Sequence, residues 1–276
     1  MALNRGSGWL TLVVSLGLAI SVSSRDEAAG TKSAYALLVL EGTTSRWPKA
    51  PADEPIQISY GLVDRSLTFS KSRNCRGLTP ISPVLQHSAI PKSTFHAELR
   101  EAFRVWEKIA HVKFRPAKNS DNADILIGSQ AEPTGFAFTD VALTAPDANG
   151  DRHIKRALIC LNPERTWKVG FDGNLEVFDL RFTLAHEIGH AIGLDHPGAK
   201  GQLMDFRYTE SFREPQAGDI AGAAALYGDA VDANIRTAGV QASDERFAPL
   251  AKSQHEGDHA NDLALRRVWS ERQSGH

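Results

Sequence analysis

The spacing of three histidines within residues 183–197 is the strongest constraint on how this chain can fold. His186 and His190 are four residues apart, so on a helix both imidazoles leave the same face, one turn from each other. Gly193 can adopt a left-handed backbone conformation, which would let the helix end there and the chain turn back. The turn would bring His196 beside the other two rings. Three imidazoles that converge in this way can occupy three corners of a metal site.

Three histidine ligands are typical of a catalytic zinc site. Structural zinc sites fill all four positions with protein ligands, whereas catalytic sites leave the fourth position to water. Glu187 directly follows the first histidine, so it would lie beside the metal without being required as a ligand. There it could take a proton from a water molecule and pass it to a leaving amine. The motif therefore predicts a hydrolytic zinc site with Glu187 as the catalytic residue.

Residues 183–197 resemble the long zinc-binding motif of the metzincins, and within them the branch of the matrixins and serralysins, the relatives of matrix metalloproteinases. Residues 202–205 supply a methionine-containing turn around Met204, a feature that metzincins carry under the metal. Residues 218–228 resemble the C-terminal helix of the same branch. The resemblance implies an α+β (α/β-like) metzincin catalytic domain. Such a domain has a twisted, mostly parallel sheet, three main helices, and a zinc cleft between an upper and a lower subdomain.

The same resemblance implies hydrolysis of internal peptide bonds, with Glu187 as general base and acid. Substrate would bind as an extended strand along a sheet edge near residues 136–141. Residues 206–215 would wall the pocket for the side chain after the cleaved bond. Serralysins place a metal-binding tyrosine two residues after the methionine, but this chain has Phe206 there, with Tyr208 nearby. A fifth, tyrosine ligand is therefore not expected.

We expect one zinc ion per chain. Matrix metalloproteinases hold a second, structural zinc with three histidines and an aspartate, and residues 150–153 resemble the stretch that supplies one of those histidines. Phe136 stands where another would be, so we interpret His153 as a surface loop residue. Residues 147–151 carry side-chain oxygens at alternate positions, as in half of a calcium loop. Such Asp-Asn-Gly runs are also common turns, so a calcium site and a simple turn both remain open.

The N-terminal residues predict export from the cytoplasm. Arg5 is the only charged side chain before Arg25, and residues 10–22 are a short apolar run that ends among small serines. This pattern describes a signal peptide, residues 1–24, that is cleaved near Ser24. A membrane span needs about 20 apolar residues, so no stable span is expected after cleavage, and an uncleaved anchor is the alternative. The mature protein would be secreted, extracellular or in the periplasm or envelope.

Export also bears on the two cysteines, Cys75 and Cys160. In an oxidising compartment two cysteines of one chain commonly pair, which predicts a disulfide between them. Two unrelated buried thiols are the alternative.

The rest of the chain divides into an arm, a domain and a tail. Residues 25–54 are interpreted as a short pro-segment or N-terminal arm, residues 55–228 as the catalytic domain, and the polar residues 229–276 as a flexible tail. Helices are predicted from a Ser93 or Thr94 cap to about Ala110, at 179–191, and after Pro215. Strands are predicted at 56–60, 111–115, 123–127 and 157–161. Residues 128–156 are predicted to be a long loop region.

The charge composition limits which kinds of molecule are expected to bind this chain. The formal net charge is −2, and no run rich in lysine and arginine occurs, so nucleic acid is not an expected partner. We expect a monomer that acts on protein or peptide substrates. One alternative is a zinc-binding module that no longer cleaves, but the presence of Glu187 argues against it. Another is an envelope protein held by an uncleaved N-terminal anchor.

Overall fold

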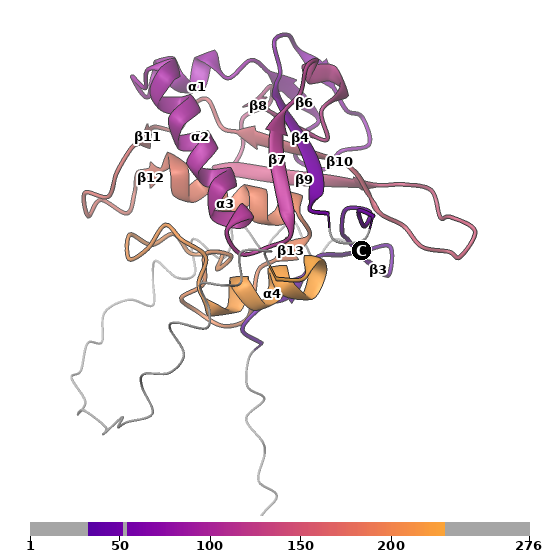
Figure 1. Ribbon diagram of the computed structural model, residues 1–276. Coiled ribbons are helices and arrows are strands. Elements are labelled where there is room, and N and C mark those ends of the chain that lie inside the picture. Colours follow the sequence, from indigo (N-terminus) through magenta and orange to yellow (C-terminus); the bar gives the residue numbers. More distant parts are fainter. Residues whose placement is uncertain (1–32, 52–53, 230–276) are drawn as a thin grey trace, which may run out of the picture. The chain divides into compact units, whose positions relative to one another are not determined.

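Figure 1 shows the computed structural model of the chain, which describes residues 33–51 and 54–229. The predicted signal peptide, residues 1–24, and the predicted tail beyond Asp229 lie outside the described residues. In the described part of the chain, none of the helices combines the length and hydrophobicity that crossing a lipid bilayer requires.

Seven strands form one mixed sheet at the centre of the fold. Its long parallel strands lie in the order β7 (Val112–Pro116), β4 (Ile56–Leu62), β8 (Ile125–Gln130) and β10 (Ile154–Leu161). Three strands are antiparallel to their neighbours: the edge strand β9 (Ala137–Leu143) beside β10, and the short β5 (Leu67–Thr68) and β6 (Gly77–Thr79). Every residue of β8 is buried, as expected of a central parallel strand.

Four helices accompany the sheet: α1 (Ser82–His87), α2 (Lys92–Glu107), α3 (Leu180–Ala191) and α4 (Ala217–Tyr227). α2 and α3 pack against each other, and the indole N–H of Trp106 in α2 donates to the Ala185 carbonyl of α3 at 2.8 Å. α4 lies next to β13 (Leu194–Asp195) at the lower end of Figure 1. The α+β fold with three main helices that the resemblance implied is therefore confirmed.

Two local predictions were wrong. α2 does not begin with a Ser93 or Thr94 cap, because it starts at Lys92 behind Pro91, whose ring already fixes φ near the helical value. The predicted loop region 128–156 contains the whole edge strand β9. Only the resemblance, which implied a sheet edge near residues 136–141, anticipated that strand.

The described part of the predicted N-terminal arm packs into the domain. β1 (Ala36–Leu37) pairs with β13, and β2 (Val39–Leu40) forms a hairpin with β3 (Thr43–Thr44). Trp47 is only 4% exposed, and its indole N–H donates to the Ala191 carbonyl at 3.0 Å. The compact part of the chain therefore begins before residue 55, the expected start of the catalytic domain.

The structure contains the predicted disulfide between Cys75 and Cys160. It ties the loop between β5 and β6 to β10, within a small apolar cluster that includes Val63, Leu78 and Leu126. One further pair of short strands, β11 (Trp167–Lys168) and β12 (Phe178–Asp179), is parallel and leads into α3.

Candidate metal centre

The candidate metal ligands stand on α3 and on the turn that follows it. Asp179 caps the start of α3, where its Oδ1 accepts the Phe182 N–H at 2.9 Å. The helix ends at Ala191, and Gly193 takes the positive φ of 98° that turns the chain back. A Cβ atom on Gly193 would also lie 2.0 Å from the Ser45 carbonyl oxygen of the N-terminal arm. A residue without a side chain is therefore required at this turn.

The turn brings the three predicted ligands together. The Nε2 atoms of His186, His190 and His196 form a triangle with 3.1 Å between each pair. A tetrahedral zinc with Zn–N distances of about 2.0–2.1 Å requires its nitrogen ligands to be about 3.3–3.4 Å apart. The observed triangle is within a few tenths of an ångström of that geometry. Among the described residues, no other group of three or more His, Cys, Asp or Glu side chains could hold a metal ion.

Backbone carbonyls fix the orientation of two of the rings. His186 Nδ1 lies 2.8 Å from the Leu203 carbonyl oxygen, and His190 Nδ1 lies 2.9 Å from the Leu194 carbonyl oxygen. A carbonyl only accepts, so in each neutral ring Nδ1 carries the proton and Nε2 presents its lone pair. Two such lone pairs 3.1 Å apart repel each other unless a cation lies between them. The donor set therefore fits a metal ion, and neutral imidazole suits zinc.

Burial keeps the ligand rings in the form that binds metal. Burial, together with the neighbouring His190, lowers the pKa of His186 to about 3. Burial likewise lowers the pKa of His196 well below its ordinary value, with His190 and His186 acting in the same direction. Because histidine must be neutral to coordinate zinc, both rings are ready for the metal at neutral pH.

Glu187 lies beside the ligand cluster and is 1% exposed. The Thr139 hydroxyl, on the edge strand β9, lies 2.7 Å from Glu187 Oε2 and 2.9 Å from the Glu187 carbonyl oxygen. Glu187 Oε1 is buried and has no hydrogen-bond partner in the described part of the chain. Burial raises the pKa of Glu187 above its ordinary value. The carboxylate is thus held on Oε2, while no group of the described residues binds Oε1.

The methionine turn lies directly under the ligand helix. Met204 is 2% exposed, and a Cβ atom on Gly189 would lie 2.2 Å from its sulfur. The carboxylate of Asp219 in α4 accepts the Leu203 N–H at 2.7 Å and the Met204 N–H at 3.0 Å. Since the Leu203 carbonyl binds the His186 ring, Asp219 secures the segment that orients this ligand. The sequence patterns did not single out Asp219 or Thr139, although Asp219 could have been noticed from the Gln216–Asp219 capping box.

Two further polar residues lie near the site without being candidate ligands, Asp195 and Tyr208. Asp195 Oδ1 accepts the backbone N–H of His196 at 2.7 Å, so this carboxylate supports the main chain of a ligand. The Tyr208 hydroxyl accepts the Asp179 N–H and donates to Glu210, both at 2.9 Å. These contacts place the Tyr208 hydroxyl at the start of α3 and away from the histidine cluster.

Two parts of the loop before β10 had raised the question of further metals, residues 147–151 and His153. Asp147 Oδ1 accepts the N–H groups of Asn149 and Asp151, at 2.8 and 2.9 Å. Such contacts are those of an Asx turn, the turn that the sequence also allowed. His153 lies just before β10 and belongs to no metal-binding group of the described residues.

Comparison with known proteins agrees with this geometry. The sequence profile of the matrixin family matches residues 82–228, which is more than half of the chain. The hatching enzyme of Paracentrotus lividus is 32% identical over 140 residues, 48% of this chain and 22% of the relative. Metalloendoproteinase 4-MMP of Arabidopsis thaliana is 26% identical over 191 residues, 66% of this chain and 48% of the relative. Human matrix metalloproteinase-19 is 30% identical over 151 residues, 51% of this chain and 27% of the relative.

The chain spans between about a fifth and about a half of the length of these relatives. The matched region holds the histidine triangle, Glu187, the methionine turn and α4, and it ends one residue after α4. The α+β fold and the profile match lead to the same result: this chain belongs to the matrixin family.

Proposed function

We propose that the chain is a zinc-dependent endopeptidase, in which His186, His190 and His196 hold the zinc and Glu187 is the general base and acid. One observation carries the proposal. Three Nε2 atoms converge at 3.1 Å from one another, beside a buried carboxylate whose Oε1 has no partner in the described residues. A metal and a reacting water would satisfy both.

The protein residues have separate tasks in this mechanism. When bound, zinc would act as a Lewis acid that polarises the scissile carbonyl and lowers the pKa of water. The Thr139 hydroxyl holds Glu187 Oε2, so the carboxylate presents Oε1 in a fixed direction. Oε1 of Glu187 accepts a proton from the attacking water, and Glu187 then gives this proton to the leaving amine. The raised pKa of Glu187 favours holding that proton between the two steps.

The position of β9 at the edge of the sheet supports the proposal that the substrate is a peptide. β9 pairs with β10 on one side and is the last strand of the sheet on the other. An extended peptide can therefore add to this edge through main-chain hydrogen bonds. Thr139 belongs to the same strand and contacts Glu187, so a peptide placed along β9 would lie next to the catalytic carboxylate.

We further propose that the protein is exported. The apolar run at residues 10–22 has the pattern of a signal peptide. The Cys75–Cys160 disulfide is of the kind that forms and persists in oxidising compartments. Mass analysis of protein collected outside the cytoplasm checks this, because cleavage near Ser24 should set its N-terminus.

The experiment that tests the proposed activity uses the purified chain and a diverse peptide pool. We expect internal cleavages that cease when a zinc chelator is added and return when zinc is restored. Cleavage that continues in the metal-free protein would contradict the mechanism, as would a zinc-loaded protein that cleaves nothing.

A further inference from the structure

A small pocket lies beside the two groups that flank the reacting bond in the proposed function. It borders His186 and Glu187, and its walls are largely aromatic. These aromatic residues are Phe136, Phe178, Phe182, Phe206 and Tyr208. A scissile carbonyl between the metal and Glu187 leaves this pocket to the side chain of an adjoining substrate residue. What the pocket admits therefore determines which bonds are cleaved.

The pocket is almost full in this chain. Its free volume is about 20 Å³, which is room for about one water molecule. The space is taken by a stack of three rings. The Phe136 and Phe178 centroids are 4.0 Å apart and the Phe178 and Tyr208 centroids 4.4 Å, with the planes within 19° of parallel. Phe182 meets the Tyr208 ring edge-on, with the centroids 5.1 Å apart.

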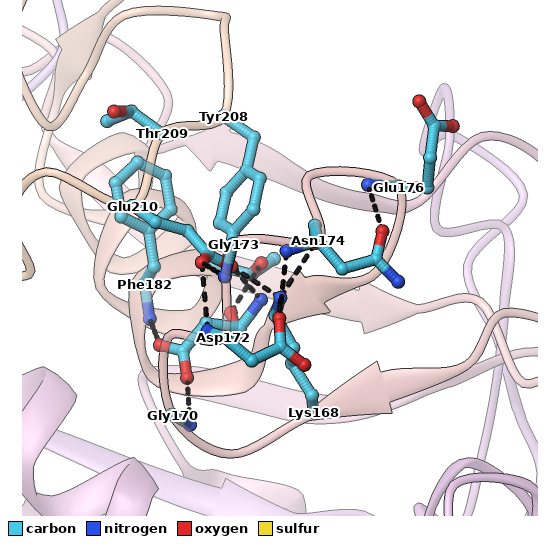
Figure 2. Close-up of polar contacts among 12 residues, drawn as sticks. Lys168, Gly170, Asp172, Gly173, Asn174, Glu176, Phe182, Tyr208, Thr209 and Glu210 are labelled. Atoms are coloured by element: carbon cyan, nitrogen blue, oxygen red, sulfur yellow. Dashed lines mark hydrogen bonds and ion pairs between the residues drawn. The ribbon is translucent and has the colours of Figure 1, made fainter.

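Tyr208 cannot turn aside without breaking contacts at its hydroxyl. That hydroxyl accepts the Asp179 N–H at the start of α3 and donates to Glu210 Oε1, both at 2.9 Å. Glu210 is itself held firmly. Its Oε2 accepts the N–H groups of Gly173 and Asp172, at 2.5 and 3.0 Å. Figure 2 shows these contacts converging between Tyr208 and the loop before α3.

The charge of Glu210 is compensated inside this cluster. Lys168 pairs with Glu210 and with Asp172, and it also donates to the Asn174 carbonyl at 2.7 Å. The Lys168 and Glu210 side chains are only 12% and 8% exposed, so solvent screens their attraction little. Burial opposes ionisation of Glu210, but hydrogen bonds from Lys168, Gly173 and Tyr208 outweigh it and lower the pKa of Glu210. The acceptor for the Tyr208 hydroxyl is therefore a fixed carboxylate.

We propose that Tyr208 is a specificity-determining residue that closes the pocket beside Glu187. The enzyme then accepts Gly, Ala or Ser in this pocket, next to the cleaved bond, and rejects large apolar side chains. Glu210 and Lys168 act as positioning residues, because they hold Tyr208 in the stack. This inference rests on the proposed endopeptidase function and adds the class of bond that it cleaves.

The first measurement maps, by mass spectrometry, the bonds that the zinc-loaded wild-type chain cleaves in a diverse peptide pool. We expect Gly, Ala and Ser to be enriched at one of the two positions that flank the cleaved bond. Peptides that differ only by Ala or Leu at that position should then differ in kcat/KM by about tenfold or more in favour of Ala.

Substitutions at Tyr208 test the cause of this preference. Tyr208→Ala should raise the ratio of Leu to Ala cleavage by about tenfold or more, because it removes the ring that fills the pocket. Tyr208→Leu keeps an apolar contact with Phe178 and provides the same test should the alanine variant fold poorly. Tyr208→Phe keeps the ring, so its Leu-to-Ala ratio should remain the nearest to wild type of the three.

Substitutions at Glu210 and Lys168 test whether these residues position Tyr208. Glu210→Gln and Lys168→Met should each raise the Leu-to-Ala ratio while the zinc content stays the same. The matched controls Glu101→Gln on α2 and Lys113→Met on β7 should leave the ratio as in wild type. If Glu210 and Lys168 had a purely structural role, their variants would cleave both peptides more slowly and the Leu-to-Ala ratio would stay unchanged.

Three outcomes would overturn the inference. Wild-type cleavage that accepts Leu as readily as Ala at both flanking positions would overturn it while leaving the proposed function intact. An unchanged Leu-to-Ala ratio in folded Tyr208→Ala and Tyr208→Leu would do the same. No zinc-dependent cleavage at all would overturn the proposed function, and this inference with it.

Discussion

At the scale of single residues, the candidate site depends on which nitrogen of each ring faces its centre. The backbone carbonyls of Leu203 and Leu194 accept hydrogen bonds from the Nδ1–H groups of His186 and His190, which leaves each Nε2 facing the centre of the site. The spacing of the histidines in the sequence predicted the ligands, because helix geometry converts a four-residue interval into a shared face. The groups that hold Glu187 and the methionine turn could not be predicted in this way. Thr139 and Asp219 lie on β9 and α4, and their partners belong to other parts of the chain, so no local pattern shows these contacts.

The role of Asp219 gives a prediction at this scale. Asp219→Asn should weaken zinc binding by about 10- to 100-fold, because the amide keeps only one acceptor oxygen where the carboxylate has two, and these two oxygens hold the Leu203 and Met204 N–H groups of the segment that orients His186. Competition with a fluorescent zinc chelator measures this. The exposed Asp64→Asn is the matched control and should bind zinc like wild type. Equal zinc affinity of Asp219→Asn and wild type would show that the turn needs no such support.

At the scale of elements, three segments differ from what sequence patterns indicated. β9 was hidden in a predicted loop, because its residues are mostly half-buried and its pairing with β10 spans a long, polar hairpin. α2 begins at Lys92 with Pro91 as its N-cap residue, before the positions that a Ser93 or Thr94 cap implies. Residues 25–54 were expected to be a pro-segment or arm outside the domain, yet they contribute Trp47 to the main core. In each case a contact distant in sequence, or a backbone constraint, outweighed the local pattern.

The packing of the arm gives the prediction for this scale. Trp47→Ala should reduce the free energy of unfolding by about 3–5 kcal/mol, since it leaves a large cavity beside α3 and removes the bond to the Ala191 carbonyl. Denaturant unfolding measures the change. Val39→Ala on the same arm is the control, because Val39 is 56% exposed and should cost little. Equal stability of the two variants would mean that the arm does not pack as described.

At the scale of the whole molecule, one covalent bond and one metal centre join distant parts of the chain. The disulfide joins Cys75 and Cys160, which are 85 positions apart in the sequence. The metal centre joins α3, β13 and, through Asp219, α4. The α+β architecture could be predicted from the resemblance because its strongest motif lies on the central helix. The order of the strands could not be predicted from periodicity alone, since alternation shows a strand but not its neighbour.

The disulfide gives a prediction for the folded molecule. Replacing both cysteines with alanine should lower the free energy of unfolding by about 2–4 kcal/mol, mainly because the unfolded chain is no longer constrained. Denaturant melts of the oxidised wild type and the double variant measure this. Addition of a reducing agent should bring the wild type close to the variant. Peptide mapping without reductant that finds two free thiols would contradict the pairing.

The metal content gives a second prediction at this scale. We expect one zinc per chain, because His153 belongs to no group of ligands among the described residues. Metal analysis after mild dialysis should give a ratio near one. A ratio near two that falls to one in His153→Ala would contradict the prediction.

The central claim is that Glu187 moves the proton while the three histidines hold the metal, and Glu187→Ala tests it most directly. The variant should keep its zinc, because Glu187 lies beside the histidine cluster and is not one of the three proposed ligands. Its rate of peptide cleavage should fall by at least about 100-fold, the lower end for general acid–base catalysis. The exposed Glu176→Ala is the matched control and should cleave like wild type. Comparable cleavage rates of zinc-loaded Glu187→Ala and wild type would contradict the account.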